Sequence, residues 1–284
     1  MKIGIGSSWS AQQTGIANMS QTIHLAQRLG GWITPDLAAR WVWPQADPKA
    51  SKKTVSDLLM RAVECRWLLA RSLGGRRLLY VVTKAGASWM VDDGEPGVTG
   101  TQLGHFKAGT WVPPATLTHD WRAARFLVDW ATKKRQEFMT DHEFHSCNRT
   151  MHKRPDGLIF QEPRLIGEEE RVFPCFWIEV EGARKSGPDL TQMVNELIAV
   201  EHGKGPTLRD QWGVLKATET MIVLPPPMPS VKHQLRIESA VRKQHPVKPV
   251  KLRFYTEIQP WKWEYAEVTV NADDDTVDDD DTWY

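Results

Sequence analysis

The run FWIEVE at residues 176–181 places two acidic side chains inside an apolar segment. The aromatic and branched residues of this run predict a strand that is buried within a sheet, where a charge is costly unless a partner compensates for it. Glu179 and Glu181 are two residues apart, so both side chains leave the same face of such a strand. We therefore expect a sheet that buries two carboxylates on one face, where a partner compensates for their charge.

An aspartate precedes this strand by about two dozen residues, in the sequence RPDG (154–157). The apolar residues after Asp156 predict a second strand, and RLIGEEER (164–171) can connect the two as antiparallel neighbours. Cross-strand pairing would then bring Asp156 beside Glu179 and Glu181. Converging carboxylates repel one another unless a cation is present, and hard oxygen ligands select Mg²⁺ or Mn²⁺. Such a metal can polarise a phosphodiester and activate an attacking water.

Two further residues extend this candidate site. Glu143, on a strand expected within 138–147, is a possible fourth acid. Lys185, just beyond the apolar strand, could stabilise the charge that develops on a phosphate in the transition state. The alternative is that Glu179 and Glu181 form the solvent-facing side of an edge strand, which their apolar neighbours argue against.

Residues 20–90 have the pattern of a winged helix-turn-helix. Helices are expected from Ser20 to the Gly30-Gly31 pair, over TPDLAARWVW (34–43), and from Ser51, where apolar residues recur at the helical period. Two β-rich runs around Gly74-Gly75 follow, which is typical of a hairpin. Three helices followed by a hairpin predict this fold.

Basic residues occupy the two places where such a module would meet double-stranded DNA. Lys52 and Lys53 lie near the start of the third helix, and Arg76 and Arg77 lie at the hairpin tip. A recognition helix enters the major groove by its N-terminal end, and a wing follows phosphates. These four residues can also be ordinary solvated positions, and the same fold also serves protein–protein contacts.

Composition divides the rest of the chain. The expected layout is a flexible arm at 1–19, the winged helix at 20–90, a Gly- and Pro-rich linker at 91–117, a second domain at 118–270 and a disordered acidic tail at 271–284. The second domain begins with Thr118 as a helix cap, and its elements follow the order αβββαβαβ. This order predicts a mixed sheet flanked by helices and, for the whole chain, an α/β (α+β) fold class.

Charge and cysteine content limit the expected binding partners and the expected cellular compartment. Seven of the 35 acidic residues lie between Asp273 and Asp281, so the chain before the tail, with all 36 Lys and Arg, carries a net charge of +8. A basic body suits a polyanionic partner. Three widely spaced cysteines indicate reduced thiols in the cytoplasm. No apolar run approaches the roughly 18 residues that a membrane span needs, so no membrane partner is expected.

Two competing kinds of site, zinc and a tyrosine nucleophile, fit the sequence less well. The histidines and cysteine of HEFHSCNRTMH match no standard zinc spacing, and His142 and His145 would point to opposite faces of a strand; the residues concerned are His142, His145, Cys147 and His152. The tyrosines that could act as nucleophiles have no convincing base beside them in the sequence: Tyr80, Tyr255, Tyr265 and Tyr284. Cleavage by an activated water is therefore preferred.

The motif PD, followed by an apolar strand that ends in E-x-E, resembles the PD-(D/E)XK nuclease superfamily, with Glu181 where the motif usually has Lys. The order of TKAGASWM (83–90), HDW (119–121), RPDG and EVEGARKSGPDL (179–190) resembles the plasmid replication-relaxation family, which includes MobC-type mobilisation relaxases. The resemblance covers about residues 20–200 and implies a restriction-endonuclease-like second domain.

The resemblance also implies a function and a set of site residues. It implies nicking of plasmid DNA at a transfer or replication origin, together with other mobilisation or replication proteins. The implied catalytic residues are Asp156, Glu179 and Glu181, joined by Glu143, His119 and Asp120. Two alternatives stay open: a winged-helix regulator of plasmid replication or transcription with an inactive core, and a restriction-like defence nuclease.

Overall fold

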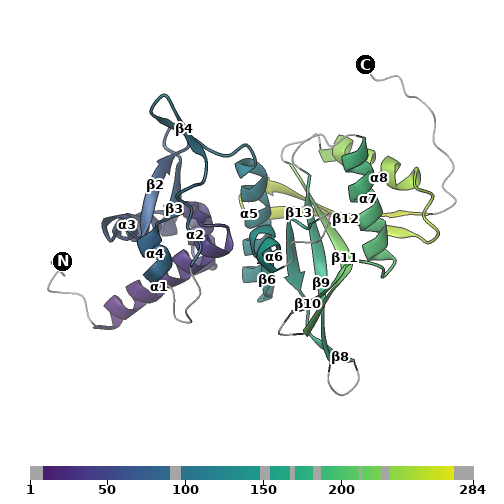
Figure 1. Cartoon of the computed structure of the whole chain (residues 1–284), viewed down its shortest axis with the longest axis horizontal. Coiled ribbons are helices and arrows are strands. Elements are labelled where there is room, and N and C mark those ends of the chain that lie inside the picture. The colour runs from purple at the N-terminus through teal and green to yellow at the C-terminus, as the bar shows by residue number, and fades with distance from the viewer. Residues whose placement is uncertain are drawn as a thin grey trace. The chain divides into compact units, whose positions relative to one another are not determined.

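The chain folds into two compact units, Met1–Ser146 and Cys147–Tyr284. The computed structural model (Figure 1) describes residues 9–89, 97–147, 154–166, 170–181, 187–210, 213–225 and 230–271. Both units combine helices with sheet, so the fold is of the mixed α/β class. Within the described ranges, every helix is too short or too polar to cross a membrane.

Three helices begin the first unit: α1 (Trp9–Arg28), α2 (Pro35–Val42) and α3 (Pro48–Glu64). Their apolar faces meet in a core that includes Ile23, Leu25, Leu37, Val55 and Leu59, all almost fully buried. The expected flexible arm at 1–19 is wrong from Trp9 onward, because α1 starts there. Most of the glycine of this region precedes residue 9, and a single helical glycine, Gly15, costs only about 1 kcal/mol relative to alanine.

A small antiparallel sheet follows the helices. It is formed by β1 (Trp32–Ile33), β2 (Leu68–Ser72) and β3 (Leu78–Val82) in the order β1-β3-β2, and α4 (Lys84–Trp89) follows it. The β2–β3 hairpin turns at Gly74 and Gly75, whose φ angles of 90° and 60° favour glycine. The expected order, three helices followed by the β2–β3 hairpin, is confirmed.

A second hairpin lies within the stretch that was expected to be a linker. Strands β4 (His105–Lys107) and β5 (Thr110–Val112) pair antiparallel. The segment before them is held against β3, because the Gly100 amide donates to the Val82 carbonyl at 2.9 Å. The hairpin turns at Ala108 and Gly109, both with positive φ. Alanine is uncommon in that conformation, so the sequence carries none of the usual Asn-Gly or Asp-Gly turn signal.

Helix α5 (Leu117–Lys134) belongs to the first unit, where it packs against α2. The Asp129 carboxylate, 2% exposed, receives Arg40 Nη2 of α2 at 2.8 Å and Lys133 Nζ at 2.7 Å. Arg125 of α5 also pairs with Asp36 of α2. The sequence placed this helix at the start of a second domain beginning at residue 118, whereas the two compact units divide after Ser146.

The second unit is built on a mixed sheet with the strand order β13-β12-β11-β9-β7. Strand β9 pairs antiparallel with β7 and β8 and parallel with β11, which in turn pairs parallel with β12. The elements are β7 (Gly157–Phe160), β8 (Arg164–Ile166), β9 (Glu170–Val180), α7 (Pro188–Glu201), β10 (Thr207–Asp210), β11 (Gly213–Leu224), α8 (Ser230–Arg242), β12 (Val250–Gln259) and β13 (Lys262–Val270). Strands β8, β10 and β13 extend the expected order.

Helices α7 and α8 cover one face of this sheet (Figure 1). The core between them contains apolar residues of both helices and of β11, β12 and β13: Met193, Val194, Leu197, Ile222, Leu224, Ile237, Val241, Val250, Leu252, Phe254 and Val270. The acids of β9 point toward this face.

Cys175 on β9 gives a chemical test of the buried sheet. Its side chain is 1% exposed, and burial raises the pKa of its thiol to about 12. Since the thiolate is the reactive form, we expect iodoacetamide at pH 8 to modify Cys65, which is partly exposed, and to spare Cys175 in the native protein. Peptide mass spectrometry measures both, and denatured protein, in which both react, is the control. Equal modification in the native state would contradict the described core.

Candidate functional site

The pairing of β7 with β9 sets the position of Asp156. Gly157 lies opposite Ile178 in the antiparallel register, and the Asp156 amide donates to the Ile178 carbonyl at 2.9 Å. The Val180 amide in turn donates to Asp156 Oδ2 at 2.6 Å. The expected antiparallel pairing is therefore confirmed, and it places Asp156 across from Glu179.

Glu179 and Glu181 lie at the carboxyl end of β9, and their exposed fractions are 1% and 0%. Glu179 is in register with Ile222 of the parallel neighbour β11, and Ile222 belongs to the core beneath α7 and α8. Residues in register on adjacent parallel strands share a face. Both glutamates therefore point to the helix-covered face, and they do not form the exposed side of an edge strand.

Each acid is turned toward a different neighbour. Asp156 accepts from the Val180 amide, Glu179 Oε1 accepts from the Trp177 indole at 2.7 Å, and Glu181 Oε1 lies 3.5 Å from Arg236 Nη2 of α8. Across the ranges that the structure describes, no three His, Cys, Asp or Glu side chains come close enough to hold a metal ion. The residue types suit a hard divalent cation, whereas their present orientations do not form a ready-made metal site.

Glu143 does not lie on a strand, which corrects the sequence expectation. Strand β6 (Phe138–Thr140) is short and is followed by α6 (Asp141–Cys147). The Thr140 amide donates to Glu143 Oε2 at 2.8 Å, and the Glu143 amide donates to Thr140 Oγ1 at 3.2 Å. This reciprocal pair is a capping box, and its T-x-x-E signature was present in the sequence as TDHE (140–143).

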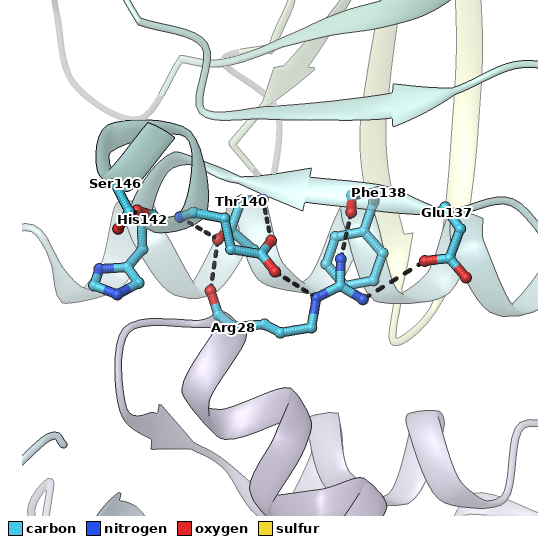
Figure 2. Close-up of polar contacts among 7 residues, drawn as sticks. Arg28, Glu137, Phe138, Thr140, His142 and Ser146 are labelled. Carbon is cyan, nitrogen blue, oxygen red and sulfur yellow. Dashed lines mark hydrogen bonds and ion pairs between the residues drawn. The ribbon is translucent and has the colours of Figure 1, made fainter. Parts of the chain in front are cut away.

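The same glutamate also binds Arg28, the last residue of α1 (Figure 2). Arg28 Nε donates to Glu143 Oε1 at 2.7 Å, and its Nη2 donates to the Phe138 carbonyl. Thr140 Oγ1 donates back to the Arg28 carbonyl at 2.5 Å, and the guanidinium lies 4.0 Å from the centre of the Phe138 ring. These contacts give Glu143 a structural role within the first unit.

His119 and Asp120 lie in the first turn of α5, where their described contacts are local. His119 Nδ1 is 3.4 Å from Asp120 Oδ1, and Thr116 Oγ1 donates to Asp120 Oδ2 at 2.8 Å. Helix α5 begins at Leu117 with Thr116 as its cap residue, and not with Thr118. Lys185 lies outside the described residues, as do His152, Tyr284 and the acidic tail after Asn271.

The competing sites also change in one respect each. His142 and His145 lie on helix α6, so the expectation that they occupy a strand and point to its opposite faces is wrong. Among the described residues, no group that could hold a metal ion includes them. Among the tyrosines, half-exposed Tyr265 on β13 does have a carboxylate beside it, since its hydroxyl donates to Glu267 at 2.6 Å. Partial burial and then this glutamate raise the pKa of Tyr265, so its hydroxyl stays protonated near neutral pH.

The four basic residues expected to meet DNA are all exposed. Lys52 and Lys53 lie in the second turn of α3, which starts at Pro48 rather than Ser51. Arg76 and Arg77 occupy the β2–β3 turn, where the Arg77 amide donates to the Gly74 carbonyl at 3.3 Å.

Comparison of the chain with protein-family models, curated proteins and solved structures gave no match.

The structural role of Glu143 can be measured as a coupling energy. In a double-mutant cycle of Arg28→Ala and Glu143→Ala, we expect an interaction of about 1 kcal/mol in the free energy of unfolding, because the pair is close and mostly buried. The control is the same cycle with Glu137→Ala, since Glu137 lies 3.8 Å from Arg28 and is 80% exposed. Urea denaturation measures both cycles. A Glu143→Ala variant of unchanged stability would show that the pair contributes nothing to folding.

Proposed function

We propose that this chain is a DNA-binding, metal-dependent endonuclease of the relaxase type, which nicks double-stranded plasmid DNA at a transfer or replication origin. The observation that carries the proposal is the β7–β9 register, which brings Asp156 beside Glu179 with Glu181 two residues further along the same face. Two acids that are almost fully buried are costly in a fold that has no use for them.

The second unit supports a restriction-endonuclease-like core in its order of elements. An antiparallel pair of strands, β7 and β9, is followed by helix α7 and the parallel strand β11. Asp156, Glu179 and Glu181 would hold Mg²⁺ or Mn²⁺ after their side chains rotate away from their present partners. Such an ion would polarise the phosphodiester and lower the pKa of the attacking water. In this proposal Lys185 balances charge on the phosphate.

The first unit supports a winged-helix role in DNA binding. Lys52 and Lys53 on α3 and Arg76 and Arg77 in the β2–β3 turn are exposed and available to phosphates. The free thiols Cys65 and Cys175 support a cytoplasmic location. The plasmid origin as substrate rests on the order of motifs in the sequence.

A second candidate function is a DNA-binding regulator of plasmid replication or transcription with an inactive core. One observation favours it: each of the three acids has a polar partner within the protein, namely the Val180 amide, the Trp177 indole and the Arg236 guanidinium. Under this alternative the acids are structural, and the protein binds DNA without cutting it.

Substitution of the acids distinguishes the nuclease from the regulator. We expect Asp156→Asn and Glu179→Gln to lower the rate of Mg²⁺- or Mn²⁺-dependent nicking of supercoiled plasmid by at least about a hundredfold, because even groups that only orient metal ligands are worth 10- to 100-fold. Affinity for DNA should change by less than about twofold, since the acids are not phosphate contacts.

The control for this experiment is Glu264→Gln, an exposed acid on β13. Calorimetric titration with Mn²⁺ gives a second readout that does not depend on cleavage, and the Asp156→Asn variant should lose binding. Wild-type protein that binds DNA but neither binds Mn²⁺ nor nicks any plasmid would establish the regulator instead.

The wing arginines should act through phosphate contacts. We expect Arg76→Ala/Arg77→Ala to weaken binding of random and origin duplexes alike and to reduce the slope of log affinity against log salt by about 1.8, because each phosphate contact contributes about 0.9. Fluorescence anisotropy from 50 to 300 mM NaCl, roughly the range over which such contacts are lost, measures the slope. Lys251→Ala/Lys262→Ala, which removes two exposed lysines of β12 and β13, is the charge-matched control. An unchanged slope in the arginine variant would remove the wing from the interface.

A further inference from the structure

The β4–β5 hairpin is an exposed arm whose described residues have no role in the proposed site. His105, Phe106 and Lys107 are all exposed, and Phe106 is 59% exposed. The tip turns through Ala108 and Gly109 with φ angles of 48° and 77°.

The base of this arm is fixed although its tip is exposed. Trp111 of β5 is 8% exposed, and its indole donates to the Leu103 carbonyl at 3.0 Å. Gly104 lies directly under that ring, since an added Cβ would come within 2.9 Å of the Trp111 side chain. Gly100 packs more closely still on the Gly31 carbonyl, 2.0 Å from an added Cβ, and its amide is hydrogen-bonded to β3. The arm is therefore held in a defined position within the first unit.

That position is beside the β2–β3 hairpin. The Arg71 guanidinium of β2 lies 4.9 Å from the centre of the Phe106 ring. Strand β2 is an edge of the small sheet, and in Figure 1 the β4–β5 arm extends near its end. A cation and an exposed ring thus lie next to the turn that carries Arg76 and Arg77.

The two hairpins share one sign of charge. Among the described residues of 68–89 and 97–112 there are five Lys and Arg and not one Asp or Glu. The five are Arg71, Arg76, Arg77, Lys84 and Lys107. The described residues of these two ranges therefore carry an excess of positive charge, which is complementary to a polyanion.

We propose that the β4–β5 arm is a second DNA-contacting element, which grips duplex DNA next to the β2–β3 wing. Lys107 contacts a phosphate, and Phe106 packs against sugars and base edges in the minor groove, where apolar side chains are used as wedges. A two-stranded ribbon is narrow enough to reach DNA, and the arm offers one apolar residue, which is too little for the apolar centre of a stable protein interface. The proposal rests on the DNA binding proposed above and assigns it a further surface.

The test compares full-length variants on a duplex labelled with a fluorophore. Lys107→Ala should weaken binding roughly 5- to 10-fold at 0.1 M salt and lower the salt slope by about 0.9. Lys107→Arg, which keeps the charge, should restore both. Phe106→Ala should weaken binding without a change in slope, because it removes no charge, and Phe106→Leu should recover part of the loss. Thr110→Ala, an exposed and uncharged position of the same arm, is the matched control.

Hydroxyl-radical footprinting then locates the contact. We expect Phe106→Ala/Lys107→Ala to lose protection at one edge of the footprint, next to the nucleotides that Arg76→Ala/Arg77→Ala exposes. If the arginine variant loses affinity while the arm variants bind and protect DNA like wild type, the second contact is overturned and the wing stands. If wild-type protein binds no duplex, the DNA-binding function itself is overturned. Thermal melting of each variant confirms that the fold is retained.

Discussion

The pairing of strand β9 with β7 on one side and β11 on the other determines where Asp156, Glu179 and Glu181 lie. The antiparallel partner brings Asp156 across from Glu179, and the parallel partner directs Glu179 to the face beneath α7 and α8. A slip of one residue in either register would move the glutamates to the opposite face. The apolar side chains of β9 prevent such a slip, because they too would exchange faces.

The same pairing creates an electrostatic cost that the protein has to balance. Removing a carboxylate from water costs several kcal/mol, which only good hydrogen bonds or ion pairs recover. Glu179 takes a bond from Trp177 on its own strand, whereas Glu181 lies near Arg236 on α8. In the proposed nuclease, catalysis and folding would therefore place competing demands on the same oxygen atoms. A divalent ion would satisfy both demands, and a purely structural role would satisfy only the second.

Local patterns predicted much of this structure. Features that depend on residues close together in the sequence could be predicted from it. They include the helical periods of α2, α3 and α7, the Gly74-Gly75 turn and the apolar strand β9. Glu143 does not lie on the expected strand because Thr140 and Glu143 form a T-x-x-E capping box that starts helix α6. The β4–β5 arm was missed because Ala108 stands where a turn usually has Asn or Asp. The orientation of the three acids could not be predicted, since Arg236 reaches the site from far along the chain.

The ion pairs between α2 and α5 bear on how this protein can be divided into modules. Asp129 joins Arg40 to Lys133, and Arg125 holds Asp36, so α5 supplies the counter-charges for α2. A fragment cut at the Gly- and Pro-rich stretch before α5 would strand Arg40 and Asp36 without these partners and uncover the apolar face of α2. A gene fusion or recombination event that transferred only the three helices and their hairpin would therefore carry an incomplete module, whereas one that extended through α5 would keep these ion pairs.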